Sequence, residues 1–211
     1  MKNPLLPPLY LITDRKLVRP DQDFFEALEQ LMVAGVRLIQ LREKDLPAQQ
    51  LYEMALRLRE ITQRHSCLLL INDRVDIALA VNADGVHLRS NSLSAAVART
   101  LLGKNKLVGV STHCAEEINT ATRDGADFVS FGPVFYTPSK AGYGSPTGIT
   151  ELLDICNSSP LPVYALGGIT STNTPAIMTT GAHGVAVISS LMAATDPKTV
   201  CQKLINAIGH T

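Results

Sequence analysis

The sequence predicts a single (β/α)8 TIM barrel, one domain that spans residues 1–211. Short apolar segments alternate with amphipathic segments, and eight such strand–helix units follow one another. The apolar segments lack the polar–apolar alternation of half-exposed strands, so they are typical of parallel strands buried on both faces. Eight units close a barrel, and 211 residues is near the short end for this fold. An open doubly wound sheet is the alternative, but it leaves strand edges that a barrel avoids.

The expected strands are short runs that are rich in Val, Ile, Leu and Phe. Glycine recurs where a helix passes into a strand, as in residues 34–36 and 125–128, and glycine commonly ends helices. The expected strand ranges are 9–12, 36–41, 67–71, 85–88, 107–110, 128–131, 163–166 and 184–188.

The segments between the strands place apolar residues three or four positions apart, which is the spacing of one helix face. In the first of them, Phe24 and Leu28 fall on one face. Pro47 suits the start of the second helix, and Ser171 or Thr172 suits the N-terminal cap of the seventh. The expected helices cover residues 21–34, 47–65, 74–81, 93–102, 115–123, 148–157, 171 or 172 to 180, and 197–208.

The composition indicates a globular protein and argues against a nucleic-acid-binding or membrane-binding surface. Hydrophobic residues make up 45% of the chain and charged residues 18%, so a large core can form. Lys and Arg together number 19, as do Asp and Glu, and a nucleic-acid or membrane surface would need a basic excess. The four cysteines form no CxxC pair, which is typical of reduced cysteines in a cytoplasmic protein. The N-terminal segment resembles neither a signal peptide nor a membrane span, and a homo-oligomer is compatible with the sequence.

The loop after the sixth strand, residues 132–147, contains three Gly, three Pro and one cation, Lys140. Neither a helix nor a strand tolerates this density of Gly and Pro. Loops of this length in compact domains are usually functional or disordered, and the hydroxyls of Tyr136 and Thr137 beside one Lys suit a lid over an anion. A surface loop without a function is the alternative.

Two anion sites are expected where the strands end, because barrel enzymes carry their chemistry there. The first combines Gly167 and Gly168, after the seventh strand, with Ser189 and Ser190, after the eighth. Glycine lets backbone N–H groups approach phosphate oxygens, and these two loops commonly hold phosphate in barrels. The alternative is that the glycine pair only makes a tight turn.

The second anion site gathers Arg42, Lys44, Asn72, Asp73 and Lys140. Arg and Lys around an acid and an amide suit a polyphosphate with a divalent metal, which the Asp would bind. Arg42 and Lys44 are two residues apart, so they point to the same side of an extended segment. The alternative is a solvated face on which Arg42 pairs with Glu43, or Arg74 with Asp76.

Two histidines lie in or near strands. His113 follows the fifth strand near Ser111, and imidazole takes up and releases protons near neutral pH, as a general base must. A structural hydrogen bond is the alternative role for it. His87 lies within an apolar strand and is expected to point into the core.

Five motifs follow one another along the chain: Gln40-Leu41-Arg42-Glu43-Lys44, Ile71-Asn72-Asp73, Gly109-Val110-Ser111-Thr112-His113, Phe131-Gly132-Pro133-Val134-Phe135 with Thr137 and Lys140, and Leu166-Gly167-Gly168-Ile169. In this order they resemble the thiamine-phosphate synthase and TenI-like family, and the resemblance covers nearly the whole chain. It implies an enzyme that joins a hydroxymethylpyrimidine diphosphate to a thiazole phosphate and releases pyrophosphate. It also implies Mg2+ as the cofactor.

The resemblance implies a role for each matched residue. The residues that would hold the pyrophosphate are Gln40, Arg42, Lys44, Asn72 and Lys140, with Asp73 binding Mg2+. Those that would hold the thiazole phosphate are Thr137, Gly168, Ile188 and Ser189, with Gly167 in the same motif. Ser111 would lie near the pyrimidine, and the expected catalytic residues are Lys140, Ser111 and His113.

One stretch departs from the synthase pattern. After the fourth strand, synthases carry His-x-Gly-Gln-x-Asp, whose Asp is a second magnesium ligand, whereas residues 87–92 here read His-Leu-Arg-Ser-Asn-Ser. Ser92 stands in place of the Asp, and Arg89 stands in place of the Gly. A hydroxyl is a weaker Mg2+ ligand than a carboxylate, so either Asn91 substitutes or Arg89 supplies charge in place of the metal.

The same stretch is closer to TenI-like proteins, some of which are thiazole tautomerases, and His113 would then be the acid–base residue. The intact pyrophosphate set favours the synthase, because the substrate of a tautomerase carries no diphosphate. We therefore expect a transferase of the synthase type. The tautomerase is the second hypothesis, and an inactive regulator that binds thiazole phosphate is the third.

Overall fold

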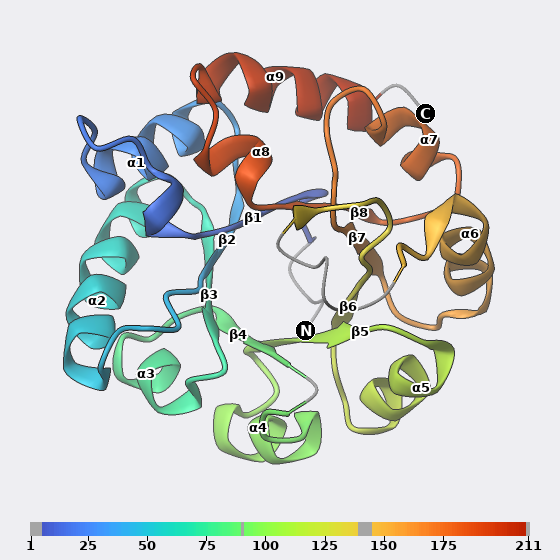
Figure 1. The fold of residues 1–211 in the computed structure, drawn as a ribbon. Coiled ribbons are helices and arrows are strands. Elements are labelled where there is room, and N and C mark those ends of the chain that lie inside the picture. The colour runs from blue at the N-terminus through green and yellow to red at the C-terminus, as the bar shows by residue number, and fades with distance from the viewer. Residues whose placement is uncertain (1–5, 90, 139–144, 210–211) are drawn as a thin grey trace.

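The computed structural model describes residues 6–89, 91–138 and 145–209. Over these residues, eight parallel strands pair in chain order, and the last pairs with the first to close a barrel (Figure 1). The predicted (β/α)8 fold is confirmed. The strands are β1 (Leu9–Ile12), β2 (Leu38–Leu41), β3 (Leu68–Asn72), β4 (Gly85–Leu88), β5 (Leu107–Thr112), β6 (Phe128–Phe131), β7 (Val163–Leu166) and β8 (Gly184–Val187).

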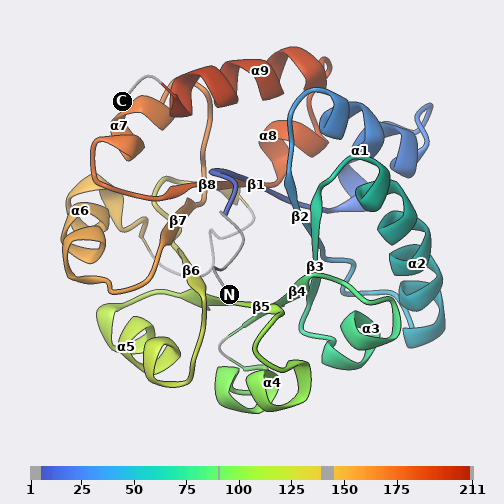
Figure 2. The same ribbon diagram turned by 180° about the vertical axis from the view of Figure 1, so that it is seen from behind.

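Helices form a ring around the barrel, which Figures 1 and 2 show from opposite ends. In the described part of the chain, no helix is both long and apolar enough to cross a membrane. The short 3-10 helix is η1 (Arg15–Leu17), and the α-helices are α1 (Phe24–Val33), α2 (Ala48–Arg64), α3 (Val75–Ala80), α4 (Ala95–Leu102), α5 (Ala115–Arg123), α6 (Gly148–Ser158), α7 (Thr174–Met178), α8 (Ser189–Met192) and α9 (Pro197–Ile208).

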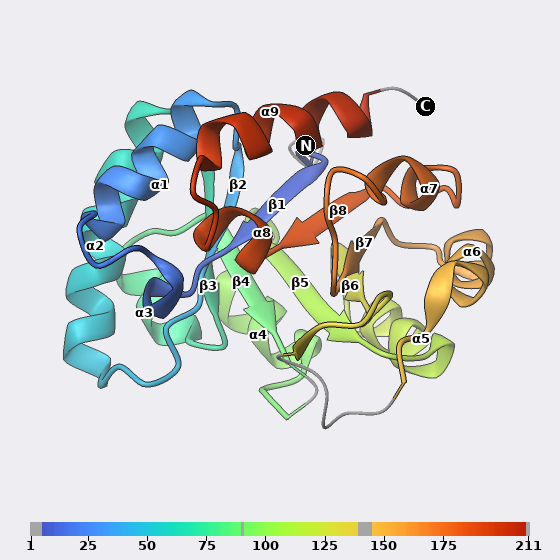
Figure 3. The ribbon, with the colours of Figure 1, turned by 45° about the horizontal axis from the view of Figure 1, so that its top comes forward.

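The helix α8 is four residues long and is not predicted by the sequence pattern. Ile188 continues the apolar run of the eighth strand, so the pattern predicts a strand as far as this residue. The backbone instead leaves the strand after Val187 and turns directly into α8. Figure 3 shows α8 between the barrel and α9, at the end of β8.

Helix starts differ from the predictions where a neighbouring side chain decides the cap. α1 begins at Phe24, because the Asp23 carboxylate accepts hydrogen bonds from the second and third helical N–H groups. Asp21, the predicted start, pairs with Arg19 instead. α7 begins after Asn173 rather than at Ser171 or Thr172, because the Asn173 amide holds the preceding turn by donating to Gly168 O at 2.9 Å.

The limits of β2, β3 and β5 also differ, and β3 covers Leu68–Asn72 rather than 67–71. β2 begins at Leu38 rather than at 36, because Val36 N donates to Leu31 O at 3.0 Å and so belongs to the end of α1. The Gly35 between them has φ +121°, as this helix end requires. β5 continues to Thr112, because Ser111 and Thr112 pair in register with β6 even though their polarity predicts a loop.

The barrel interior is filled in its N-terminal half by aromatic rings. Tyr10, Phe128 and Tyr164 pack against one another, with ring centroids 5.8, 5.4 and 5.3 Å apart. Gly109 makes room for this layer, because a Cβ at this position would lie 2.3 Å from Phe128 Cζ. A separate and larger apolar core lies between the strands and the helices. The interior therefore opens toward the C-terminal ends of the strands.

Candidate functional site

A cavity of about 590 Å3 opens at the C-terminal ends of the strands, and all eight strands or the segments that follow them contribute to its walls. Most of the predicted site residues line it: Gln40, Arg42, Lys44, Asn72, Ser111, His113, Thr137, Gly167, Gly168, Ile188 and Ser189. Asp73 does not line the cavity but follows Asn72, which does. Lys140, and with it the centre of the predicted lid, lies outside the described residues.

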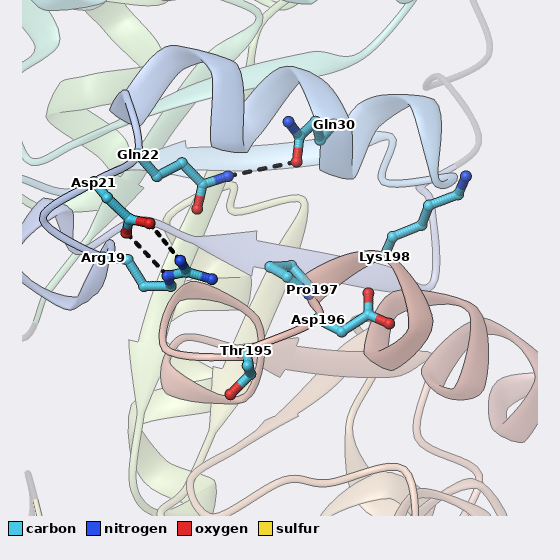
Figure 4. A pocket seen from close by; sticks show the side chains of 8 residues that line it. All are labelled: Arg19, Asp21, Gln22, Gln30, Thr195, Asp196, Pro197 and Lys198. Carbon is cyan, nitrogen blue, oxygen red and sulfur yellow. Dashed lines mark hydrogen bonds and ion pairs between the residues drawn. The ribbon is translucent and has the colours of Figure 1, made fainter.

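A smaller cavity of about 340 Å3 lies on the outside of the barrel, between the start of α1 and the start of α9 (Figure 4). Arg19 Nε there donates to Asp21 at 3.0 Å, and Gln22 Nε2 donates to Gln30 at 3.4 Å. None of the predicted site residues lines it. We therefore place the functional site in the larger cavity.

The floor of the larger cavity is a chain of buried polar groups above the aromatic layer. Gln40 Nε2 donates to Tyr10 Oη at 2.6 Å, and Tyr10 Oη lies 3.1 Å from His87 Nδ1. His87 Nε2 lies 2.9 Å from Ser111 Oγ and 3.3 Å from Ser130 Oγ. His87 is thus buried inside the barrel, as its apolar strand predicts, but it belongs to a polar network rather than to an apolar core.

These contacts fix where the protons of the network lie. Burial lowers the pKa of His87 to about 4, so its ring is neutral near pH 7. Tyr10 Oη accepts from Gln40, so it directs its own hydrogen to His87 Nδ1. The imidazole proton therefore lies on Nε2 and is donated to Ser111 Oγ.

Ser111 consequently acts as a hydrogen-bond donor toward the cavity. Its oxygen accepts from His87 and from Ser130, whose Oγ lies 3.5 Å away. The hydrogen of Ser111 remains for a group inside the cavity, which Ser111 lines. The floor is thus prepared for a ligand that carries an acceptor such as a ring nitrogen.

A cationic wall stands at the ends of β2 and β4, where Arg42, Lys44 and Arg89 line the cavity. Burial lowers the pKa of Arg42. The negative charge of Asp14 opposes this shift, and the positive charge of the nearby Arg89 adds to it. The two guanidinium groups therefore lie close enough to repel each other. Such an arrangement favours a bound anion.

The alternative interpretation, in which Arg42 and Arg74 form salt bridges on a solvated face, is only partly right. Arg74 does pair with Asp76, at 2.6 Å. Glu43, however, is buried and accepts hydrogen bonds from Thr13 Oγ1 at 2.7 Å and from Arg15 Nη1 at 3.0 Å, not from Arg42. The Arg42 backbone is held by Thr13 Oγ1 at 2.9 Å, so Glu43 and Thr13 together fix the strand end that carries the cation.

The Asp73 carboxylate is enclosed by donors of the protein itself. Its Oδ2 accepts from Asn72 Nδ2 at 3.0 Å and from Arg89 Nε. Its Oδ1 accepts from the Arg89 backbone N–H at 3.2 Å and from Ser92 Oγ. Burial alone would raise the pKa of Asp73, but the bonds from Ser92 and Arg89 outweigh it and hold the pKa below its usual value.

This set of contacts does not fit the magnesium site that the resemblance implies. Mg2+ needs oxygen ligands with free lone pairs in a near-octahedral arrangement. Both oxygens of Asp73 are engaged by N–H or O–H donors, and a guanidinium occupies the space beside them. Among the described residues, no three His, Cys, Asp or Glu side chains lie close enough together to hold a metal ion.

A second wall faces the cationic one across the barrel, because β7 and β3 are four strands apart in a closed ring of eight. Gly167 and Gly168 there have φ +101° and +63°, and a Cβ on Gly168 would lie 2.6 Å from Tyr136 O. The glycine pair therefore does make the tight turn, and it also lines the cavity beside Ser189 at the start of α8. Loops after strands 7 and 8 with a short extra helix are the usual phosphate site of barrels.

His113 lies at the rim of the cavity. Its backbone N–H donates to Glu117 Oε2 at 2.6 Å, and its Nδ1 lies 3.3 Å from the same oxygen. The side chain remains largely exposed. The structure thus brings His113 and Ser111 to one cavity, as predicted, with the His held by a carboxylate that sequence reasoning does not single out.

Sequence reasoning assigned no site role to Tyr10, Thr13, Glu43 or Ser130. Tyr10 and Thr13 hold residues that line the cavity, and Glu43 holds Thr13. Ser130 lines the cavity itself. The polar Ser130 within an otherwise apolar strand is the signal that could have identified one of them. Tyr10 has no such signal, because an aromatic residue in a buried strand is ordinary.

Most of the chain is similar to proteins of one family. The family model described as thiamine monophosphate synthase matches residues 9–191. A putative thiamine-phosphate synthase of Geobacter sulfurreducens is 50% identical over 197 residues, which cover 93% of this chain and 92% of that protein. The thiamine-phosphate synthase of Clostridium acetobutylicum is 42% identical over 186 residues, or 88% of this chain and 87% of that one. A solved thiamine phosphate pyrophosphorylase from Pyrococcus furiosus matches with a TM-score of 0.86 at 35% identity, over 95% of each chain.

Proposed function

This chain belongs to the thiamine monophosphate synthase family, and we propose that it joins a hydroxymethylpyrimidine diphosphate to a thiazole phosphate and releases pyrophosphate. It is a transferase of thiamine biosynthesis. The C–O bond between the pyrimidine methylene and the diphosphate breaks, and its electron pair leaves with the pyrophosphate. The thiazole nitrogen then forms a C–N bond to the cation-like methylene.

The observation that carries this proposal is one cavity with two anion-binding walls. Arg42, Lys44 and Arg89 line one side, and Gly168 and Ser189 line the opposite side. Two phosphorylated substrates can therefore bind with their rings facing each other above the polar floor. A site for a single phosphorylated substrate needs one such wall.

The residues take roles that follow from their positions. Arg42, Lys44 and Asn72 hold the diphosphate and stabilise the charge that grows on it as it leaves. Ser111 donates to a ring nitrogen of the pyrimidine. Gln40 belongs to the floor beneath this ring, because its amide is bound to Tyr10.

The opposite wall holds the thiazole phosphate, with backbone N–H groups and hydroxyls as the donors. The residues that form it are Thr137, Gly167, Gly168, Ile188 and Ser189. Lys140, which lies outside the described residues, is kept in the proposal as a further cation for the diphosphate, and His113 lies at the rim of the cavity. No general base is needed for the bond-forming step, because the thiazole nitrogen attacks through its own lone pair.

The resemblance implies Mg2+ as a cofactor, but the donors around Asp73 do not fit this ion, so no step above depends on it. The relatives described above carry the names synthase or pyrophosphorylase, which does not favour the tautomerase or the inactive regulator.

The test is an assay of the purified chain with both substrates, following the joined product and pyrophosphate. Product and pyrophosphate in equal amounts are expected, with turnover strongly reduced by Lys44→Ala and unchanged by Arg123→Ala, an exposed arginine at the end of α5. Binding of thiazole phosphate without any product would overturn the synthase proposal. Aromatisation of the non-aromatic thiazole tautomer would then test the second hypothesis.

A further inference from the structure

We propose that the Arg89 guanidinium takes the place of the metal ion at Asp73, so that the diphosphate is bound and activated without a divalent cation. This inference rests on the proposed function for its substrate, but its binding tests do not depend on turnover. The observation behind it is the ion pair between Arg89 Nε and Asp73 Oδ2, at the position where the family pattern has a glycine.

The ion pair is built into the strand ends rather than formed by two mobile side chains. Asp73 follows β3 with φ +59°, a left-handed conformation that a non-glycine residue adopts only where its surroundings hold it. Its backbone N–H donates to His87 O at 3.0 Å, and the Arg89 backbone N–H donates to Asp73 Oδ1 and to Ser92 Oγ. The ends of β3 and β4 are thereby joined around one carboxylate.

Arg89 is oriented to bind a second anion. Its Nε faces Asp73, and among the described residues its two terminal nitrogens form no hydrogen bond. The side chain is 39% exposed, and the residue lines the cavity next to Arg42 and Lys44. A guanidinium held on one edge by a carboxylate presents its other edge as a pair of parallel donors, which matches two oxygens of a phosphate.

The departures at residues 89 and 92 from the family pattern compensate each other in charge. Two aspartates with one divalent ion sum to zero, and one aspartate with one arginine also sums to zero. Replacing the second Asp by Ser92 therefore removes the charge that would attract a metal, and placing Arg89 nearby restores the cation. Ser92 completes this arrangement by donating its hydroxyl hydrogen to Asp73 Oδ1.

The chemical step remains balanced under this assignment. The C–O bond breaks, both electrons leave with the pyrophosphate, and the negative charge is taken up by the guanidinium groups of Arg42 and Arg89 and the Lys44 ammonium. No oxidant, proton donor or other reactant is required. A guanidinium suits this role because it stays protonated and matches two phosphate oxygens with two parallel donors.

The first test measures binding of inorganic pyrophosphate by calorimetry in the presence of EDTA. The unmodified chain is expected to bind, Arg89→Ala to lose about tenfold or more in affinity, and Arg89→Lys to lose part of it. Arg123→Ala, which removes an exposed arginine that does not line the cavity, is expected to bind as the unmodified chain does. Pyrophosphate binding that needs Mg2+, or that Arg89→Ala leaves unchanged, would overturn the proposal.

The second test restores the Gly and the Asp of the family pattern in the variant Arg89→Gly/Ser92→Asp. Electron paramagnetic resonance with Mn2+ as the probe is expected to show bound metal for this variant and none for the unmodified chain. Strong Mn2+ binding by the unmodified chain would overturn the proposal. If circular dichroism shows that the double variant does not fold, the single substitutions and the EDTA experiment still decide. If the unmodified chain makes no product while the binding results hold, the proposed function fails and the role of Arg89 in binding the anion stands.

Discussion

Replacing Tyr10 with Phe removes one oxygen atom from the floor of the cavity and leaves the volume of the ring unchanged. Tyr10 is fully buried, and its Oη joins Gln40 Nε2, at 2.6 Å, to His87 Nδ1, at 3.1 Å. The substitution therefore creates no cavity. It leaves one buried donor and one buried acceptor without a partner.

The expected loss of stability follows from these two atoms. An unsatisfied buried polar group costs roughly 1–3 kcal/mol, and the hydroxyl that is removed no longer has to be desolvated on folding. We expect the free energy of unfolding to fall by about 2–4 kcal/mol. Tyr164→Phe is the matched control, because this ring belongs to the same aromatic layer and its Oη donates to only one backbone oxygen, Pro7 O at 2.7 Å. Its expected loss is about 1 kcal/mol.

The same substitution is expected to change ligand binding selectively. Without Tyr10 Oη, the imidazole proton of His87 is no longer confined to Nε2, so Ser111 is no longer fixed as a donor to the cavity. We expect the affinity for the pyrimidine diphosphate to fall about tenfold, the equivalent of one hydrogen bond, while the affinity for inorganic pyrophosphate is unchanged.

Urea unfolding and calorimetry with the two ligands measure these quantities. Unchanged stability of Tyr10→Phe would refute the buried network. Equal losses of affinity for the pyrimidine diphosphate and for pyrophosphate would refute the role assigned to Ser111.

Three further perturbations test other parts of the structure. Burial lowers the pKa of His87 to about 4, so the unfolded chain binds the extra proton between about pH 6.5 and pH 4. The neutral His87 therefore contributes roughly 3 kcal/mol to the free energy of unfolding, in full above pH 6.5 and progressively less as the pH falls toward 4. Urea unfolding of His87→Gln should lack this pH-dependent loss of stability. Gly168→Ala places a Cβ 2.6 Å from a backbone oxygen in a left-handed conformation, so calorimetry should show about tenfold weaker binding of thiazole phosphate. Glu43→Gln turns an amide donor toward the donors of Arg15 and should lower the free energy of unfolding by about 2–4 kcal/mol, whereas Asp45→Asn, on an exposed pair, should cost under about 1 kcal/mol.

The sequence alone determined the eight strand–helix units, their order and the end of the barrel that carries the site. These features depend on local patterns, namely apolar runs, helical spacing and glycine at helix ends, and a local pattern needs no knowledge of distant residues. Strands β1, β4, β6 and β7 and helices α5 and α9 have their predicted limits. That the predicted site residues gather around one cavity was also predictable, because parallel strands bring their C-terminal ends to one face.

Only the tertiary structure decided which partner each polar side chain takes. The sequence places Glu43 beside Arg42, but the pairing of β1 with β2 brings the segment after β1 to Glu43, which therefore accepts from Thr13 and Arg15 instead. Asp73 was expected to hold a metal, and the register of β3 against β4 places Arg89 on its carboxylate.

The buried hydrogen-bond network in the cavity floor shows most clearly that the sequence does not reveal which polar side chains become partners. Tyr10 and His87 are 77 residues apart, and His87 and Ser111 are 24 apart, yet they form one chain of hydrogen bonds. Strand register sets these contacts, and the register of each strand follows from closing all eight into a ring. The physical reason is that a hydrophobic pattern belongs to one segment of the chain, whereas the hydrogen-bond partners of a polar side chain are set by how all the strands pair in the closed barrel.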